Sequence, residues 1–458
     1  MARENTLDNI FTDYDESIFS DGSIDPMGLR IIWTSIGSKI FHNKLNTIST
    51  DIKLYTLNLF HHYLLQKCAS EEEDGVNKLI RKKPYFNKSD LFEGMVIFLE
   101  NLLINATYNL GDSSLVVPGK NKLSNLKNNE SKRNTIEKIS VNRDKGILVR
   151  QYLLGIHGRH KGPFLQMGVF KQNEEDIYNN PEVWKEASEI FKSSPWKEAE
   201  IVLTELIKNK LLNFTIKANA FIEYKVEDVL TKSIEEKYVA LLKKDIYVDE
   251  AIRSFWLNRL GLKEDTAGIL YKAYLKQKVK GLNFQKIIVS AYSESNDPYL
   301  GAINAIEPLL TLIDKCINRI LSSATSKIDD DLKEFIDHWL KNNEVDPGKI
   351  TAYLSVDYIN QEAINRLQKL LDIYINASQS DKSAENFIIN LIKYHEDIMK
   401  TRGNLNWVSI GADNKIFVHR SIYISDPHLT YLKSMTWVNS YYLPTVDSLH
   451  KGLTNEAA

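Results

Sequence analysis

The chain has 458 residues, of which 43% are hydrophobic and 26% are charged, an ordinary composition for a globular protein. This length exceeds that of one ordinary core, so we expect two to four packed units. Its 20 glycines and 11 prolines are few, which favours helices over many short strands. The net charge of −2 excludes a uniformly basic nucleic-acid binder but leaves room for a local basic patch.

Cysteine usage and hydropathy point to the compartment. Cys68 and Cys316 lie far apart and form no CxxC pair, so we expect a reducing, cytoplasmic environment. The first residues are acidic and lack the apolar core of a signal peptide. No apolar run is long enough to span a bilayer, so the sequence predicts no membrane contact.

Residues 5–25 combine acidic residues with Phe11, Tyr14 and Phe19. This pattern predicts an arm laid over the surface, and the alternative is an acidic–aromatic peptide that docks on a basic partner. Asp13 and Asp15 lack further ligands at useful spacing, so we predict no metal site there.

Residues 1–110 are predicted to form a helical unit. A first helix should run from Pro26 to Leu45, with Asp25 as its N-cap and Pro26 at the first helical position. Apolar residues at spacings of three and four predict further helices over 51–68 and 90–110. His61 and His62 should diverge by about 100° on their helix, which prevents them from binding one metal ion together.

Residues 111–145 are polar and lysine-rich, which predicts a basic, flexible connection. Between Lys120 and Lys161 eleven basic residues face three acidic ones, an excess of about +8 in a chain whose total is −2. Three interpretations stay open. The stretch is a solvated loop, it contacts nucleic acid, or it binds an acidic protein segment such as the chain's own N-terminal arm.

The most unusual window is Gly155–Pro163, with the sequence GIHGRHKGP. A helix over 146–154 should end at Gly155. A Gly-rich basic loop should follow, and 164–170 should return to the core as a short strand or an extended segment. Such a loop suits an anion, because glycines let the backbone approach closely and the basic side chains supply charge. The alternatives are a structural turn and acid–base chemistry by His157 and His160.

The remaining residues predict helices in two further regions, 146–292 and 293–458. Asn180-Pro181 and Ser194-Pro195 mark helix starts, and 213–224 alternates weakly like a strand. Later, Pro298 to Ser322 should form a long helix, and Asp329–Asp331 should begin the next one. Residues 407–420 predict a β-hairpin and 426–451 a final helix. The predicted fold class is therefore mostly α, with a small central β element and a C-terminal hairpin.

No catalytic or metal-binding motif is present, and no cofactor is predicted. We expect a non-catalytic subunit that contacts the nucleic-acid backbone beside an enzymatic partner such as an ATPase or nuclease. A bacterial DNA-processing or anti-phage assembly is the expected context, which no single residue specifies. The alternatives are a phosphodiester-acting enzyme centred on the HGRHKG segment and a protein–protein scaffold. The predicted nucleic-acid contacts are Arg143, Lys145, Arg150, His157, Arg159, His160 and Lys161.

Overall fold

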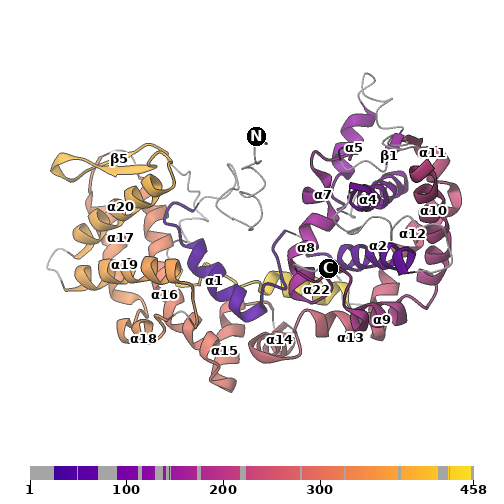
Figure 1. The fold of residues 1–458 in the computed structure, drawn as a ribbon. Helices are drawn as coiled ribbons and strands as arrows, with labels where there is room; N and C mark the ends of the chain where they lie inside the picture. Colours follow the sequence, from indigo (N-terminus) through magenta and orange to yellow (C-terminus); the bar gives the residue numbers. More distant parts are fainter. Residues whose placement is uncertain are drawn as a thin grey trace, which may run out of the picture. The chain divides into compact units, whose positions relative to one another are not determined.

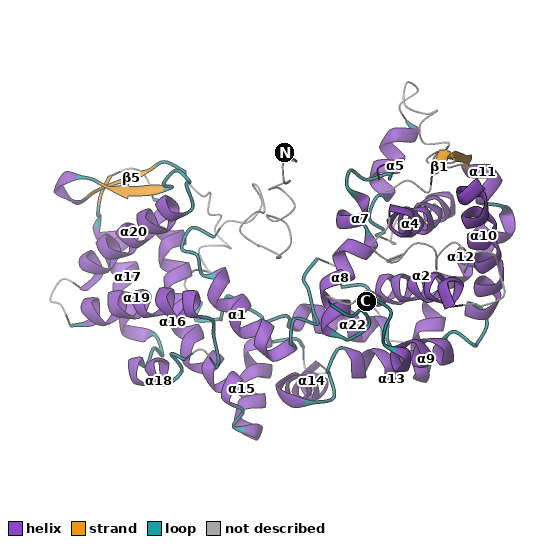
Figure 2. Cartoon of the chain, viewed as in Figure 1, coloured by secondary structure: helices purple, strands orange, loops and turns teal. Residues whose placement is uncertain are grey.

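The structure is a computed structural model in which most of the described residues are helical (Figure 2). It describes residues 25–48, 50–70, 90–111, 116–128, 138–140, 144, 146–172, 177–216, 223–278, 281–323, 326–355, 357–379, 383–420, 432 and 434–454. The predicted fold class is confirmed, because the strands of these residues make only two small antiparallel sheets. None of the described helices is long and apolar enough to cross a bilayer.

The chain divides into two compact units, each assembled from segments far apart in sequence. Unit 1 comprises residues 1–37 and 288–441, and unit 2 comprises residues 38–287 and 442–458. The predicted boundary at 292/293 lies near the change of unit at 287/288, whereas those at 110/111 and 145/146 fall inside unit 2. The predicted division of the chain at these positions stays a prediction.

Unit 2 is organised around α2 (Ile52–Ser70), which is buried on nearly every side (Figure 1). Its histidines diverge as predicted, because His61 bonds to Tyr238 while His62 bonds to His157 and Tyr178. The other longer helices of this unit are α4 (Asp90–Leu110), α9 (Pro181–Ile190), α10 (Trp196–Ile216), α12 (Lys232–Leu241), α13 (Glu250–Arg259) and α14 (Asp265–Gln277). Short pieces join them, namely α11 (Val226–Val229) and the 3-10 helix η4 (Lys244–Val248).

Two parts of the predicted flexible connection are ordered, so the prediction is wrong there. Helix α5 (Lys120–Lys127) packs on α4 and buries Leu123. Strand β1 (Lys138–Ser140) pairs antiparallel with β2 (Glu223–Lys225), which places part of the central sheet outside the predicted strand region. The prediction was based on the lysine-rich composition and overlooked the few apolar side chains that anchor these elements.

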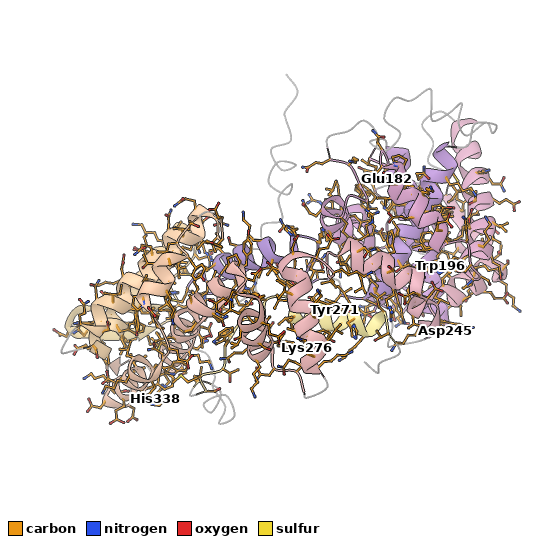
Figure 3. The ribbon with its side chains drawn as sticks, turned by 90° about the horizontal axis from the view of Figure 1, so that it is seen from below. Glu182, Trp196, Asp245, Tyr271, Lys276 and His338 are labelled. Carbon is orange, nitrogen blue, oxygen red and sulfur yellow. The ribbon has the colours of Figure 1, made fainter. Side chains whose placement is uncertain are left out.

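The C-terminal helix α22 (Leu443–Gly452) belongs to unit 2 and packs against α2. It starts later than the predicted 426–451 helix, because 434–442 is irregular and most of 421–433 lies outside the described residues. A polar cluster joins α22 to α14, where His450 shares a hydrogen bond of 2.8 Å with Tyr271. Figure 3 shows Tyr271 on α14 beside the yellow ribbon of α22.

Unit 1 contains α16 (Pro298–Leu321), α17 (Asp330–Asn342), α18 (Pro347–Ala352), α19 (Gln361–Ser378) and α20 (Ser383–Thr401). The predicted helix starts at Pro298 and at Asp329–Asp331 are confirmed, and both are capped: Asp297 accepts from Tyr299 N–H at 2.9 Å and Asp329 accepts from Leu332 N–H at 2.8 Å. The chain changes unit within α1 (Arg30–Phe41) and again within α15 (Phe284–Ser295).

The predicted hairpin is confirmed in unit 1. Strands β4 (Val408–Ile410) and β5 (Lys415–Val418) are antiparallel, with Val408 opposite Val418. Their connection is a 3-10 turn, η6 (Ala412–Asn414), in which Asp413 takes a φ of 61°. A third short strand that the sequence did not predict, β3 (Ser326–Lys327), pairs with β5.

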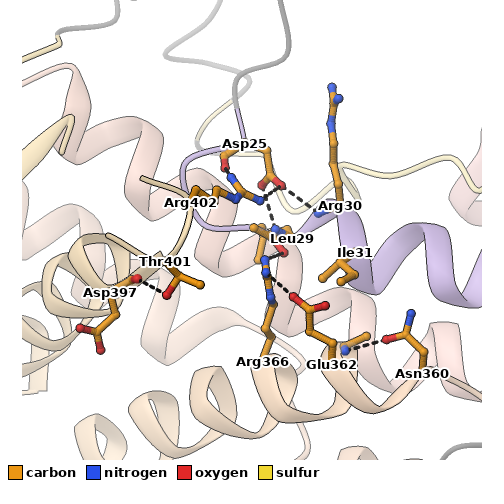
Figure 4. A network of polar contacts seen from close by, with 12 residues as sticks. Asp25, Leu29, Arg30, Ile31, Asn360, Glu362, Arg366, Asp397, Thr401 and Arg402 are labelled. Atoms are coloured by element: carbon orange, nitrogen blue, oxygen red, sulfur yellow. Dashed lines mark hydrogen bonds and ion pairs between the residues drawn. The ribbon is translucent and has the colours of Figure 1, made fainter. Parts of the chain in front are cut away.

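The start of α1 corrects another prediction. Asp25 caps the chain as expected, but it accepts from Leu29 N–H at 2.8 Å, and the helix begins at Arg30 rather than at Pro26. Arg402 from the end of α20 bridges to Asp25 at 3.3 Å, as Figure 4 shows. This long-range ion pair favours a tight turn over residues 26–29, which local capping rules do not anticipate.

Glu307 on α16 is the buried acceptor at the centre of unit 1. Its carboxylate accepts hydrogen bonds from the side chains of Trp33, Thr311 and Tyr441 and from the Asn439 N–H, at 2.7 to 3.2 Å. Burial raises the pKa of Glu307 to about 7, although each of these donors lowers it. The network fixes α1 and residues 438–441 against α16.

Candidate functional site

The predicted Gly-rich loop is a helix, so this part of the site prediction is wrong. Residues Gln151–Leu154 form the short helix α7, and Ile156–Gln166 form α8. Gly155 does end the first helix, as predicted, but the chain turns at once into the second. The short strand or extended segment predicted over 164–170 is also absent, because α8 continues to Gln166 and a turn follows.

The glycines of this window serve packing within the protein. A Cβ at Gly158 would overlap the backbone carbonyl of Leu153, and one at Gly155 would overlap the Glu100 carboxylate. Gly162 differs, because a Cβ there would meet nothing within 4 Å. These glycines do allow the close backbone approach that suggested an anion site. The groups that approach them, however, are α7 and the internal Glu100 carboxylate.

Pro163 lies inside α8 and cannot donate the hydrogen bond that the carbonyl oxygen of Arg159 would receive in a regular helix. The side-chain amide of Asn46 fills this position, donating to Arg159 O at 2.8 Å. A residue more than a hundred positions away in sequence therefore makes a proline-containing helix tolerable here.

The acidic acceptor at the N-terminus of α8 is Glu100 from α4. Its Oε1 accepts from His157 N–H at 2.7 Å, and Ile156 N–H also donates to it. A carboxylate suits this place because the first N–H groups of a helix lack partners within it and carry partial positive charge. Burial nevertheless raises the pKa of Glu100 to about 7. Sequence reasoning missed this residue, although a single acid within the apolar run of 95–106 was a signal.

Both predicted histidines are buried, at 1% exposure for His157 and 0% for His160. Desolvation lowers their pKa values to about 3 and about 4, so both rings are neutral at pH 7. His157 shares a hydrogen bond of 2.8 Å with His62, and His160 donates to Ile156 O at 2.6 Å. Buried neutral rings cannot touch a phosphate outside the fold, so the direct contact predicted for them is corrected to a packing role.

The basic residues predicted to contact nucleic acid differ from one another in their exposure. Arg150 and Lys161 are exposed, and Arg150 precedes α7 with a φ of 53°. Arg159 is half-buried; its Nε donates to Leu154 O at 3.1 Å, and its charge lowers the pKa of Glu100. The structure therefore brings Arg159 close to an internal acid and leaves the other two at the surface. Arg143 and Lys145 lie outside the described residues.

Helices α5, α7 and α8 follow one another along one edge of unit 2 (Figure 1). Gly119, before α5, lies so close to Leu148 that a Cβ there would be 3.5 Å from the Leu148 side chain. We call this surface the α5–α7–α8 edge. Its exposed cations are Lys122, Arg150 and Lys161, and its exposed aliphatic residues are Val116, Val149, Leu153 and Leu154.

The aliphatic residues of this edge are unusually open. Val149 is 79% exposed and Val116 is 77% exposed, while Leu153 and Leu154 are each about half exposed. Sequence reasoning counted only the charges, because the hydrophobic residues of a predicted helix are expected to face a core. The edge is therefore both basic and apolar, which is typical of a surface that binds a partner.

Among the residues that the structure describes, no three His, Cys, Asp or Glu side chains are placed to hold a metal ion. Comparison with known proteins found no matching family model, curated protein or solved structure.

Proposed function

We propose that this chain is a non-catalytic, nucleic-acid-contacting subunit, and that the α5–α7–α8 edge binds the phosphate backbone. The observation that carries the proposal is the exposure of Lys122 on α5, Arg150 directly before α7 and Lys161 on α8, all along one edge. Cations of this kind bind phosphates by releasing counterions and need no base contacts. The proposed binding is therefore strongly salt-dependent and weakly sequence-dependent.

A contact role is favoured over phosphodiester chemistry by the state of the two histidines. General acid–base catalysis needs a group that reaches the substrate and titrates near the working pH. Both rings are enclosed, and their pKa values are depressed by burial to about 3 and about 4. The enzyme alternative would have to use other residues.

The test is fluorescence anisotropy with labelled single- and double-stranded DNA and RNA over a range of salt concentrations. Replacing Lys122, Arg150 and Lys161 with glutamine should weaken binding about uniformly across sequences and reduce the salt slope by roughly three units at most. The matched control replaces Lys185, Lys232 and Lys272, three exposed lysines elsewhere in unit 2, with glutamine. No binding at low salt, or an equal effect of both triple variants, would refute the proposal.

The proposed context is a cytoplasmic bacterial assembly for DNA processing or anti-phage defence, with an enzymatic partner such as an ATPase or nuclease. The support is indirect: a nucleic-acid-contacting protein without catalytic groups of its own needs a partner that acts on what it holds. Affinity purification from the native cell followed by an activity assay would test this. Recovery of the chain alone would argue against an assembly.

A second candidate function, a protein–protein scaffold, is favoured by the exposed Val149, Leu153 and Leu154 on the same edge. Aliphatic side chains gain more from burial against a protein than from a phosphate backbone. Replacing these three residues with serine separates the two functions. The change should leave the salt slope intact if the edge binds nucleic acid through its cations, and should abolish partner capture if the edge binds protein.

A further inference from the structure

The Glu100 carboxylate ties together the two segments that carry the proposed contact residues. Its Oε2 accepts from Gln151 Nε2 at 3.1 Å, and its Oε1 accepts from His157 N–H at 2.7 Å. The Gln151 amide oxygen in turn accepts from Leu148 N–H at 3.2 Å. A continuous hydrogen-bonded path therefore links the segment before α7, which includes Arg150, to α4 and to the first turn of α8.

The two side chains of this path are closed to solvent. Glu100 is 1% exposed and Gln151 is fully buried. Gly155 lies against the carboxylate so tightly that a side chain there would overlap it, and a Cβ on Gly146 would lie 2.8 Å from Gln151 Oε1. Exposure of Glu100 therefore requires movement of the residues packed on it, among them Gln151 and Gly155.

We propose that Glu100 is a proton-dependent latch: its ionisation while buried favours the opening of residues 146–157 and so changes how the α5–α7–α8 edge presents Arg150. The proposed opening of residues 146–157 depends only on the hydrogen bonds of Glu100. The consequence for binding rests on the proposed nucleic-acid contact.

The charged and titratable groups around Glu100 determine the pH range over which it ionises. Arg159 on α8 is the cation that lowers its pKa, and Tyr152 on α7 responds to its charge. The nearby histidines, His62 on α2 and His157 on α8, are kept neutral because burial lowers their pKa values. Burial of Glu100 outweighs its donors and places its pKa at about 7, above the ordinary value of 4.5.

The direction of the pH dependence follows from the linkage between proton binding and closure. A carboxyl group with a raised pKa in the closed state holds its proton more tightly there than when it is hydrated. Closure is therefore most favourable at acid pH, becomes less favourable as pH rises above 4.5, and stops changing above about 7. An open state with the ordinary pKa implies a roughly tenfold rise in the opening equilibrium between pH 6 and pH 8.

Amide hydrogen exchange followed by mass spectrometry on the wild-type protein tests this directly. After correction for the intrinsic effect of pH on exchange, the protection of peptides covering 146–157 should fall roughly tenfold from pH 6 to pH 8. Peptides from α9 and α13 in the same unit should not change. Equal protection of 146–157 at both pH values would overturn the proposal without any variant.

Substitutions then test whether Glu100 is the group whose ionisation changes the protection. Glu100→Gln should lower protection at pH 6 and remove its pH dependence, because an amide does not titrate and offers only one acceptor for several donors. Glu307→Gln is the matched control, since Glu307 is a buried acid of unit 1 whose pKa is also about 7. It should leave the pH response of 146–157 intact. A Glu100→Gln protein that keeps the wild-type response would overturn the assignment.

A second pair tests the electrostatics without touching Glu100. Arg159→Met removes the cation that lowers the pKa of Glu100, so the loss of protection should extend to higher pH. Lys161→Met removes an exposed lysine two positions further along α8 and should leave the window unchanged. The same shift in both variants, or no shift in either, would contradict the proposed role of Arg159.

Binding measured at pH 6 and pH 8 separates this inference from the proposed function. If both hold, the affinity for single- or double-stranded DNA should depend on pH in the wild type and not in Glu100→Gln. If no nucleic acid binds while exchange keeps its pH response, the latch stands and the proposed function fails. If nucleic acid binds but exchange is independent of pH, the latch fails.

Discussion

The side-chain amide of Asn46 donates a hydrogen bond of 2.8 Å to the carbonyl oxygen of Arg159, the acceptor that Pro163 leaves without a helical donor. Asn46 lies between α1 and α2, and Arg159 lies in the middle of α8. Because an unpaired buried carbonyl is costly, this one bond lets the IHGRHKGPFLQ sequence form a helix through its proline.

This relationship predicts a measurable coupling between Asn46 and Pro163. Asn46→Ala should lower the free energy of unfolding by about 1–3 kcal/mol, because it leaves the Arg159 carbonyl unsatisfied. In a Pro163→Ala background the N–H of residue 163 can supply the missing bond, so the same substitution should cost less. Urea unfolding of the four proteins of this double-mutant cycle measures the difference. Equal costs in both backgrounds would show that the amide does not compensate for the proline.

The glycines of α8 should respond to alanine to different extents. Gly158→Ala should destabilise by about 1–3 kcal/mol, because the new methyl group meets the Leu153 carbonyl and pushes α7 from α8. Gly162→Ala meets nothing within 4 Å beyond its chain neighbours, but Pro163 disfavours a β-carbon on a helical residue before it, which offsets the gain in helix propensity. The free energy of unfolding should therefore change by less than about 1 kcal/mol in Gly162→Ala. Thermal unfolding of the two variants is sufficient, and an equal loss in both would contradict the role given to Gly158.

Tyr441→Phe should have a pH-dependent cost, because it removes one donor from Glu307. At pH 9 Glu307 is ionised, so the lost bond should cost about 1.5–3 kcal/mol; at pH 5 the acid is neutral and the cost should be about 0.5–1.5 kcal/mol. The sign follows from the fact that the Tyr441 hydroxyl lowers the pKa of Glu307, which burial has raised to about 7. Tyr374→Phe, which removes a bond to the neutral Asn343, should show the same cost at both pH values. Urea unfolding at each pH provides the comparison.

His160→Ala should affect stability and leave the salt slope of nucleic-acid binding unchanged. The ring is fully buried and packs edge-on against Tyr55 at 4.3 Å between ring centres, so its removal should cost on the order of 3 kcal/mol. Thermal unfolding measures the first effect and anisotropy over a salt series the second. A reduced slope in a folded variant would return His160 to the contact surface.

Much of the secondary structure could be predicted from local sequence. Asp297 and Asp329 cap helices because a short acid before a helix can accept its free N–H groups, which is a property of neighbouring residues. The hairpin over 407–420 was equally readable, since its two strands and its turn are adjacent in sequence. The prediction of a loop at 155–163 failed because glycine and proline were judged by their local tendencies alone.

The sequence by itself determined that this is a mostly helical chain with a basic stretch between Lys120 and Lys161. Only the tertiary structure decided which of those residues face outward. Glu100 satisfies the first N–H groups of α8, and Asn46 satisfies its interrupted carbonyl, so a weak helix is stabilised by partners that are distant in sequence. The two histidines are buried as a consequence, while Arg150 and Lys161 stay at the surface. Long-range hydrogen bonds offset poor local propensity here because they satisfy backbone groups that would each cost about 1–3 kcal/mol if left buried and unpaired.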